Sequence, residues 1–130
     1  MTGTGRALDS ASRTTQVEVS MALAAPAYRH FDTAVLGTIF AARTAVVRRL
    51  SVGDRLILVP DPPGAQIPAV WVHAEGGDVI GHLPLQIAVW LAPWMIAGGC
   101  CGATVQKVGN DAVESWRRLL IEVTCHERPP

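Results

Sequence analysis

The stretch AVWVHAEGGDVIGHLP, residues 69–84, decides the fold class that the sequence predicts. Its first half alternates, so Val70 and Val72 are expected on one face of a strand and Trp71 and His73 on the other. The turn sequence EGGD then leads into a second short apolar run. This pattern predicts a β-hairpin with one buried face.

Further short strands are expected on both sides of this hairpin. They are apolar or β-branched segments bounded by turn residues, at 33–41, 55–59, 103–108 and 117–124. Gly37 lies inside the first of these segments and predicts a bulge or a close backbone approach. Residues 44–50 predict a short helical turn, and the proline-rich residues 60–68 predict a loop.

One main helix is expected after the hairpin. Pro84 suits a first helical turn, and helical spacing places four large apolar side chains together, those of Ile87, Trp90, Leu91 and Trp94. Pro93 is expected to kink or split this helix, and the Gly-Gly pair at 98–99 is expected to end it. The fold class predicted is mostly β with one main helix (α+β), arranged as a small, partly open barrel.

Length and composition predict one domain. The chain has 130 residues, of which 49% are hydrophobic, enough for one core. We expect an N-terminal arm at 1–27, a domain at 28–126 and a tail at 127–130. The sequence has neither an apolar run long enough for a membrane span nor a secretory pattern, so we expect a cytoplasmic protein without a membrane partner. Eleven basic and eleven acidic residues balance, which argues against tight non-specific binding of nucleic acid.

Three cysteines, at 100, 101 and 125, are expected to be reduced thiols. A zinc site formed by them with His126 is the alternative, but two adjacent pairs do not match the usual ligand spacing. Cys125 and His126 are also unsuited to a catalytic pair, because neighbouring residues of a strand point to opposite faces. We therefore expect small buried thiols and no metal or other cofactor.

From Phe31 onward, the chain resembles the HIRAN domain family. Four segments that keep the family's order and spacing carry the resemblance: GTIF at 37–40 with Arg43, LSVGDRLILV at 50–59, the hairpin at 69–84, and the helix at 88–98. The resemblance as a whole spans about three-quarters of the chain. The resemblance implies a modified oligonucleotide-binding (OB-like) barrel, found alone in bacteria or fused to helicases and nucleases. It also implies binding of the 3′ end of a single DNA strand.

The loop at 63–68 departs from the family pattern. Members of the family carry an Asn-Pro-x-Asp-x-Asn run there, whose polar side chains help to form the ligand site. This chain has PGAQIP instead, with prolines in place of both asparagines and Gln66 in place of the aspartate. The barrel is therefore expected to persist without much of the family's binding chemistry, and fold does not carry function across such a gap.

Six residues are candidates for binding nucleic acid: Trp71, His73, His82, Arg43, Arg48 and Arg49. An outward Trp71 could stack a base, or it could pack under the N-terminal arm or at a dimer contact. The resemblance places His82 near the ligand pocket, although a strand-end histidine bonded to the backbone is the alternative. The arginines, with Arg117 and Arg118, form either a local basic patch or a solvated charged face. Trp90 and Trp94 are expected in or near the core, and Trp116 could close the barrel end.

The sequence contains no catalytic or phosphate-binding motif, so we expect a protein that is not an enzyme. Three functional hypotheses follow. The first is a domain that binds single-stranded DNA or DNA ends. The second is a protein-interaction or assembly module on the same barrel, whose N-terminal arm contacts a partner or a second copy. The third is a small-molecule-binding or catalytic derivative that uses the pocket, supported only by thiols and histidines.

Overall fold

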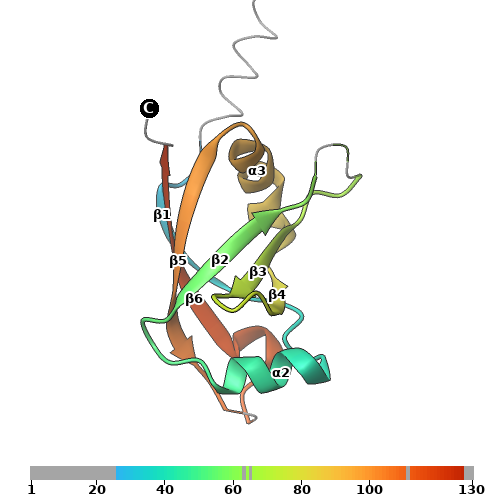
Figure 1. Ribbon diagram of the computed structural model, residues 1–130, viewed down its shortest axis with the longest axis vertical. Helices are drawn as coiled ribbons and strands as arrows, with labels where there is room; N and C mark the ends of the chain where they lie inside the picture. The colour runs from blue at the N-terminus through green and yellow to red at the C-terminus, as the bar shows by residue number, and fades with distance from the viewer. Residues whose placement is uncertain (1–25, 63, 65, 111, 128–130) are drawn as a thin grey trace, which may run out of the picture.

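The computed structural model describes residues 26–62, 64, 66–110 and 112–127. These residues form an antiparallel sheet with two α-helices and one 3-10 turn (Figure 1). In chain order the elements are β1 (His30–Ala34), α2 (Ala41–Arg48), β2 (Arg55–Pro60), β3 (Val70–Ala74), β4 (Val79–His82), α3 (Leu85–Ile96), β5 (Gly99–Val108), η1 (Ser115–Arg117) and β6 (Leu119–Glu127). Residues 1–25 of the predicted arm and residues 128–130 of the predicted tail lie outside the described part of the chain.

The six described strands lie in the order β1-β6-β5-β2-β3-β4, and every pairing is antiparallel. The two longest strands, β5 and β6, pair along almost their whole length, with a shift of register between Val105 and Lys107. Strand β2 crosses from this pair to the β3–β4 hairpin, as Figure 1 shows. The sheet is therefore strongly curled rather than flat.

A single β-bridge joins the two ends of this curled sheet. The backbone N–H of Leu36 donates to the carbonyl of His82 at 2.8 Å, and the N–H of His82 donates back at 2.9 Å. One residue earlier, the N–H of Val35 donates to the carbonyl of Leu119 at 2.9 Å. The segment after β1 thus contacts β6 on one side and β4 on the other. The result is a small, partly open barrel, in agreement with the coarse fold predicted from the sequence.

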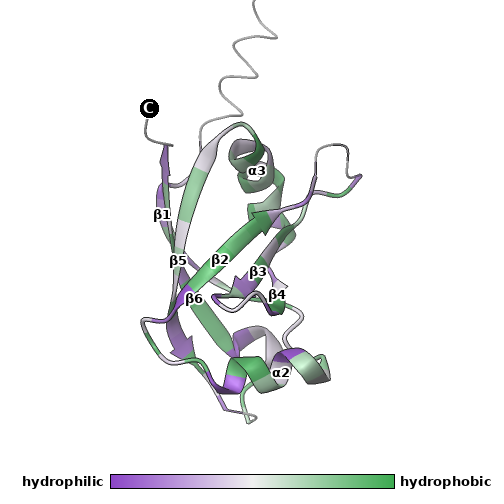
Figure 2. Ribbon diagram, in the orientation of Figure 1, coloured by the Kyte–Doolittle hydropathy of each residue, from purple (hydrophilic) through white to green (hydrophobic). Residues whose placement is uncertain are grey.

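The core fills the inside of the curled sheet and is covered at one end by α3. Alternate residues of β3 and β6 are buried, and Val70, Val72, Ile121 and Val123 have no exposed surface. Helix α3 adds Trp94, which is 3% exposed, and both α3 and β2 are mostly hydrophobic (Figure 2). The predicted alternation in the hairpin is confirmed, because Val70 and Val72 are buried and Trp71 is not. The predicted positions of the two α3 tryptophans are also confirmed, because Trp94 lies in the core and Trp90 packs against its rim.

Several predicted boundaries are wrong, for local reasons. The strand expected at 33–41 is β1 at 30–34, because Gly37 has a φ of +75° that turns the chain away from the sheet. Helix α2 consequently begins before the expected helical turn. Pro93 does not split α3, which continues to Ile96. The last strand begins at Leu119, because the residues before it form the 3-10 turn η1.

Strand β5 also begins earlier than expected, immediately after α3. Gly99 is its first residue, and a Cβ at this position would clash with the indole of Trp94. The glycine therefore serves close helix–strand packing as well as ending the helix. Within the described ranges, no helix is both long enough and apolar enough to cross a membrane.

We predict that Gly81→Ala destabilises the fold. A Cβ at Gly81 would clash with the carbonyl oxygen of Leu36 and lie 2.6 Å from a methyl group of Val35, so the bridge would have to open. We expect a loss of about 1–3 kcal/mol in the free energy of unfolding, measured by urea denaturation. Gly102→Ala is the matched control, because nothing lies within 4 Å of its added Cβ and it should be neutral or slightly stabilising. Equal stability of the two variants would contradict the importance of the bridge.

Candidate nucleic-acid interface

Trp71 and His82 form the centre of the candidate site. They are partners across the β3–β4 hairpin, and their rings meet edge to face with centroids 5.8 Å apart. Both side chains lie on the outer face of the sheet and are half-buried. The predicted orientation of Trp71 is correct, but the indole is not bare, because neighbouring side chains cover part of it.

Asp61 fixes the indole from the other side. The Nε1–H of Trp71 donates a hydrogen bond of 2.8 Å to the Asp61 carboxylate. The backbone of Asp61 is itself held, since its N–H donates to the carbonyl of Ala69 at 2.9 Å. The Asp61 carboxylate is a charged hydrogen-bond acceptor on a backbone that is itself hydrogen-bonded, and it therefore restricts the orientation of the Trp71 indole.

Arg43 enters the cluster from α2. Its guanidinium carbon lies 4.8 Å from the ring centre of Phe40 and 5.9 Å from that of Trp71, within the range of cation–π attraction. One guanidinium N–H donates to the carbonyl of Gly37 at 3.0 Å. Phe40 is 61% exposed, so the arginine and this ring present an aromatic and cationic surface to solvent.

The turn at 37–40 holds this arrangement together. A Cβ at Gly37 would lie 3.2 Å from both the Arg43 guanidinium and the His82 ring, so the glycine allows the two side chains to meet. The buried Thr38 anchors the turn, because its carbonyl accepts a hydrogen bond of 2.8 Å from the Thr44 hydroxyl. Helix α2 is therefore fixed relative to the barrel, and Arg43 with it.

The ring of His82 is held by the backbone of the next residue. Its Nδ1 lies 3.1 Å from the carbonyl of Leu83. A carbonyl only accepts, so Nδ1 is the donor in this hydrogen bond. The ring is thus bonded to the backbone, as the structural alternative expected, and it also forms one wall of the cluster with Trp71.

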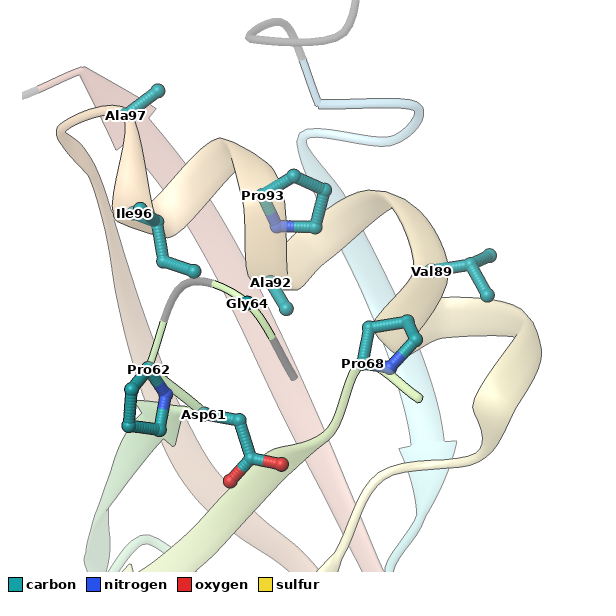
Figure 3. Close-up of a pocket in the computed structure, with 9 residues that line it drawn as sticks. All are labelled: Asp61, Pro62, Gly64, Pro68, Val89, Ala92, Pro93, Ile96 and Ala97. Carbon is teal, nitrogen blue, oxygen red and sulfur yellow. The ribbon is translucent and has the colours of Figure 1, made fainter. Parts of the chain in front are cut away.

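Two apolar hollows flank the cluster. A groove of about 260 Å³ is lined by Trp71, His82 and the neighbouring residues Ile67, Pro68, Ala69, Leu83 and Leu85. A larger cleft of about 430 Å³ lies between α3 and the 61–68 loop (Figure 3). In that view Ala92 and Ile96 point from α3 toward the loop, Pro93 lies between them along the helix, and Val89 lies nearer its beginning. Pro68 borders both hollows, so they are neighbours.

The remaining predicted site residues lie elsewhere. The Nδ1 of His73 lies 3.2 Å from the carbonyl of Gly77, which ties this histidine to the hairpin turn. Arg48 and Arg49 are exposed at the C-terminal end of α2, and Arg48 borders a separate hollow formed with residues 108–110. The structure thus brings Arg43 to Trp71 and His82, and places His73, Arg48 and Arg49 outside this cluster.

The second pair of arginines does not join the patch either. Arg117 forms an ion pair of 3.8 Å with Glu114 and lies over the ring of Trp116. Arg118 donates to the carbonyl of Val113 at 3.1 Å. Trp116 is 56% exposed, so the prediction that it closes the barrel end is wrong. Its 3-10 turn directs the indole outward instead of into the core.

Two members of the cluster were missed in the sequence. The sequence singles out Phe40 only as part of the GTIF segment, and Asp61 only as part of the predicted loop at 60–68. Phe40 contacts Arg43 three residues later, and Asp61 reaches Trp71 across the proline-rich loop, so neither contact belongs to the strand pattern that predicted the hairpin. In the described part of the chain, no group of three or more His, Cys, Asp or Glu side chains is placed to hold a metal ion.

None of the protein-family models, curated proteins or solved structures compared with this chain matches it. The resemblance to HIRAN domains therefore stays an expectation from the sequence. The function has to be inferred from the geometry of the cluster itself.

We predict that Trp71 and Asp61 are energetically coupled. In a double-mutant cycle of Trp71→Phe and Asp61→Ala, the loss of the hydrogen bond should give a coupling of about 1 kcal/mol in the free energy of unfolding. A control cycle of Trp116→Phe with Asp61→Ala should show none, since Trp116 contacts Arg117 instead. Strictly additive effects for the first pair would show that the hydrogen bond does not hold the indole.

Proposed function

We propose that this protein is a small, non-catalytic binding domain for single-stranded DNA or DNA ends, built on an OB-like barrel of the HIRAN type. One observation carries the proposal. The guanidinium of Arg43 lies against Phe40 and Trp71, with His82 beside them, on one face of the barrel. Aromatic rings combined with an arginine are what single-strand binding requires.

The exposed ring of Phe40 supports stacking of a base. An aromatic ring stacked on a base contributes roughly 1–3 kcal/mol, and it does so for any base. Trp71 and His82 border the adjoining groove, which gives a second base an apolar surface next to two rings. Arg43 remains charged at any physiological pH and has further N–H donors for a phosphate besides the one bonded to Gly37.

The charge of the site supports modest affinity. The chain has no net charge, and within the cluster one arginine and one carboxylate, those of Arg43 and Asp61, both contact Trp71. Few phosphates can then be neutralised, so binding should depend on salt with a shallow slope. Stacking is expected to contribute more of the binding free energy than charge.

The proposal is tested by fluorescence polarisation with a short labelled single strand at low and moderate salt. We expect measurable binding by the wild type, weakened about tenfold by Phe40→Ala and by Arg43→Ala. Two matched controls should bind like the wild type: Trp116→Ala removes an exposed aromatic ring outside the cluster, and Arg49→Ala removes an exposed cation that caps the C-terminal end of the helix carrying Arg43. Blocking the 3′ end of the strand then distinguishes end binding from internal binding.

No binding at low salt, or equal losses in the controls, would overturn the assignment of a DNA site to this cluster. Trp71→Ala is less suitable as the first variant, because Trp71 also carries the hydrogen bond to Asp61 and its loss affects folding.

We further predict that Asp61→Asn strengthens DNA binding. Asparagine keeps an oxygen that accepts the Trp71 hydrogen bond but removes the negative charge that repels phosphate. At low salt we expect about a two- to fivefold lower Kd, and the gain should shrink as salt is added. Glu75→Gln, which removes an exposed carboxylate from the hairpin turn, is the matched control and should change binding less. An unchanged or weaker affinity of Asp61→Asn would mean that phosphate does not approach this carboxylate.

The second candidate is a protein-interaction module, and the cleft beside α3 favours it. Prolines from the loop and apolar side chains from α3 line this cleft, including Val89 and Ile96, which are 49% and 44% exposed. An extended apolar or proline-containing peptide fits such a surface. This candidate gains support if no single strand binds.

A further inference from the structure

Two of the three thiols face each other inside the β5–β6 ladder. Cys101 of β5 and Cys125 of β6 are direct partners in the register, and their sulfur atoms are 3.7 Å apart. Both point to the inner face of the sheet, in line with Ala103 and Val123 of the core. Cys125 is 4% exposed, whereas Cys101 is half-buried.

The backbone hydrogen bonds show which kind of pair this is. The N–H of Cys125 donates to the carbonyl of Arg29 at 2.7 Å, on the side of β1. It therefore points away from β5, which makes Cys101 and Cys125 a non-hydrogen-bonded pair of the antiparallel ladder. In such pairs the Cα atoms are about 4.5 Å apart and the side chains are closest. This separation lies within the range that a disulfide spans.

We propose that Cys101 and Cys125 form an oxidisable dithiol, which a hydroperoxide converts into an intramolecular disulfide. The Cys125 thiolate attacks one peroxide oxygen: an S–O bond forms, the O–O bond breaks, and the leaving oxygen takes up a proton. The Cys101 sulfur then attacks the Cys125 sulfur, forming the S–S bond while the S–O bond breaks. The departing hydroxide takes the Cys101 proton and leaves as water, so two thiols are oxidised and one peroxide is reduced.

The environment of the pair supports these roles. The hydrogen bond between the two sulfur atoms lowers the pKa of Cys125 below its usual value, and the positive charge of Arg29 lowers it further against the opposing effect of burial. The same hydrogen bond, together with burial and the charge of Cys125, raises the pKa of Cys101 far above its usual range. Both shifts favour the thiolate at Cys125, in agreement with the attacking role that the proposal gives this sulfur.

Cys100 provides an internal comparison. It is the neighbour of Cys101 on β5, so its side chain points to the opposite face of the strand, and its partner in the register is His126 rather than a cysteine. It is also more exposed than Cys125. If exposure alone decided which thiol reacts, Cys100 would be oxidised before the buried Cys125.

The test uses the reduced full-length chain, treated with hydrogen peroxide in small excess and then with an alkylating reagent. We expect the alkylated thiols to fall from three to one, with a loss of two hydrogens in the intact mass and no covalent dimer. Cys100→Ser should still form the disulfide, leaving no alkylated thiol. Cys101→Ser and Cys125→Ser should not form it, and Cys125→Ala repeats the test with an apolar side chain in case serine is not tolerated in the core.

A second measurement reports on the fold. The disulfide would close a loop from 101 to 125 in the unfolded chain, so the urea midpoint of the oxidised protein should rise, and a reducing thiol should reverse the rise. Cys100→Ser should show the same shift, and the Cys101 and Cys125 variants should show none. Loss of oxidation in Cys100→Ser, or oxidation of all three thiols to sulfinic or sulfonic acid without an S–S bond, would overturn the proposal.

Discussion

The pair of hydrogen bonds between Leu36 and His82 is the constraint on which the rest of the structure depends. An open antiparallel sheet of this length would leave two edges of unpaired backbone groups and an uncovered inner face. The bridge brings the chain after β1 against β4, so it pairs backbone groups of the two edges and encloses the inner face of the sheet. It is feasible only because Gly81 has no Cβ, since any side chain there would meet the Leu36 carbonyl. The contact with Leu36, more than forty positions earlier in the chain, therefore requires a glycine at position 81 of the hairpin.

The same closure assembles the candidate site. Leu36 pairs with His82, and the next residue, Gly37, turns the chain toward α2 while its carbonyl receives the Arg43 guanidinium. His82 is simultaneously the strand partner of Trp71. Three segments from different parts of the chain thus meet at one point, and the aromatic and cationic side chains they carry become neighbours. The site is a consequence of barrel closure rather than an addition to it.

This dependence explains how much the sequence could predict. The hairpin at 69–84 was predictable with its faces, because alternation and a turn sequence act locally. The clustering of Phe40 and Asp61 with Trp71 was not, because it follows from closure and from the path of a proline-rich loop. The Cys101–Cys125 pair was also hidden, since it depends on the β5–β6 register, which shifts at Val105. The predicted arginine patch does not form, because Arg43 lies in the first turn of α2 whereas Arg48 and Arg49 lie at its C-terminal end, and helix positions five apart do not share a face.

Asp61 connects the structural and functional roles of the cluster. Its carboxylate holds the Trp71 indole at a fixed angle, and a fixed indole loses less conformational freedom on binding a ligand than a mobile one. The same carboxylate adds a negative charge to the cluster that contains Arg43 and so weakens any attraction of phosphates. A site with this weaker attraction for phosphates is suited to ligands that bind through their aromatic faces more than through their charge. That balance agrees with a chain of zero net charge and distinguishes this cluster from the broad basic grooves that bind nucleic acid mainly through its backbone.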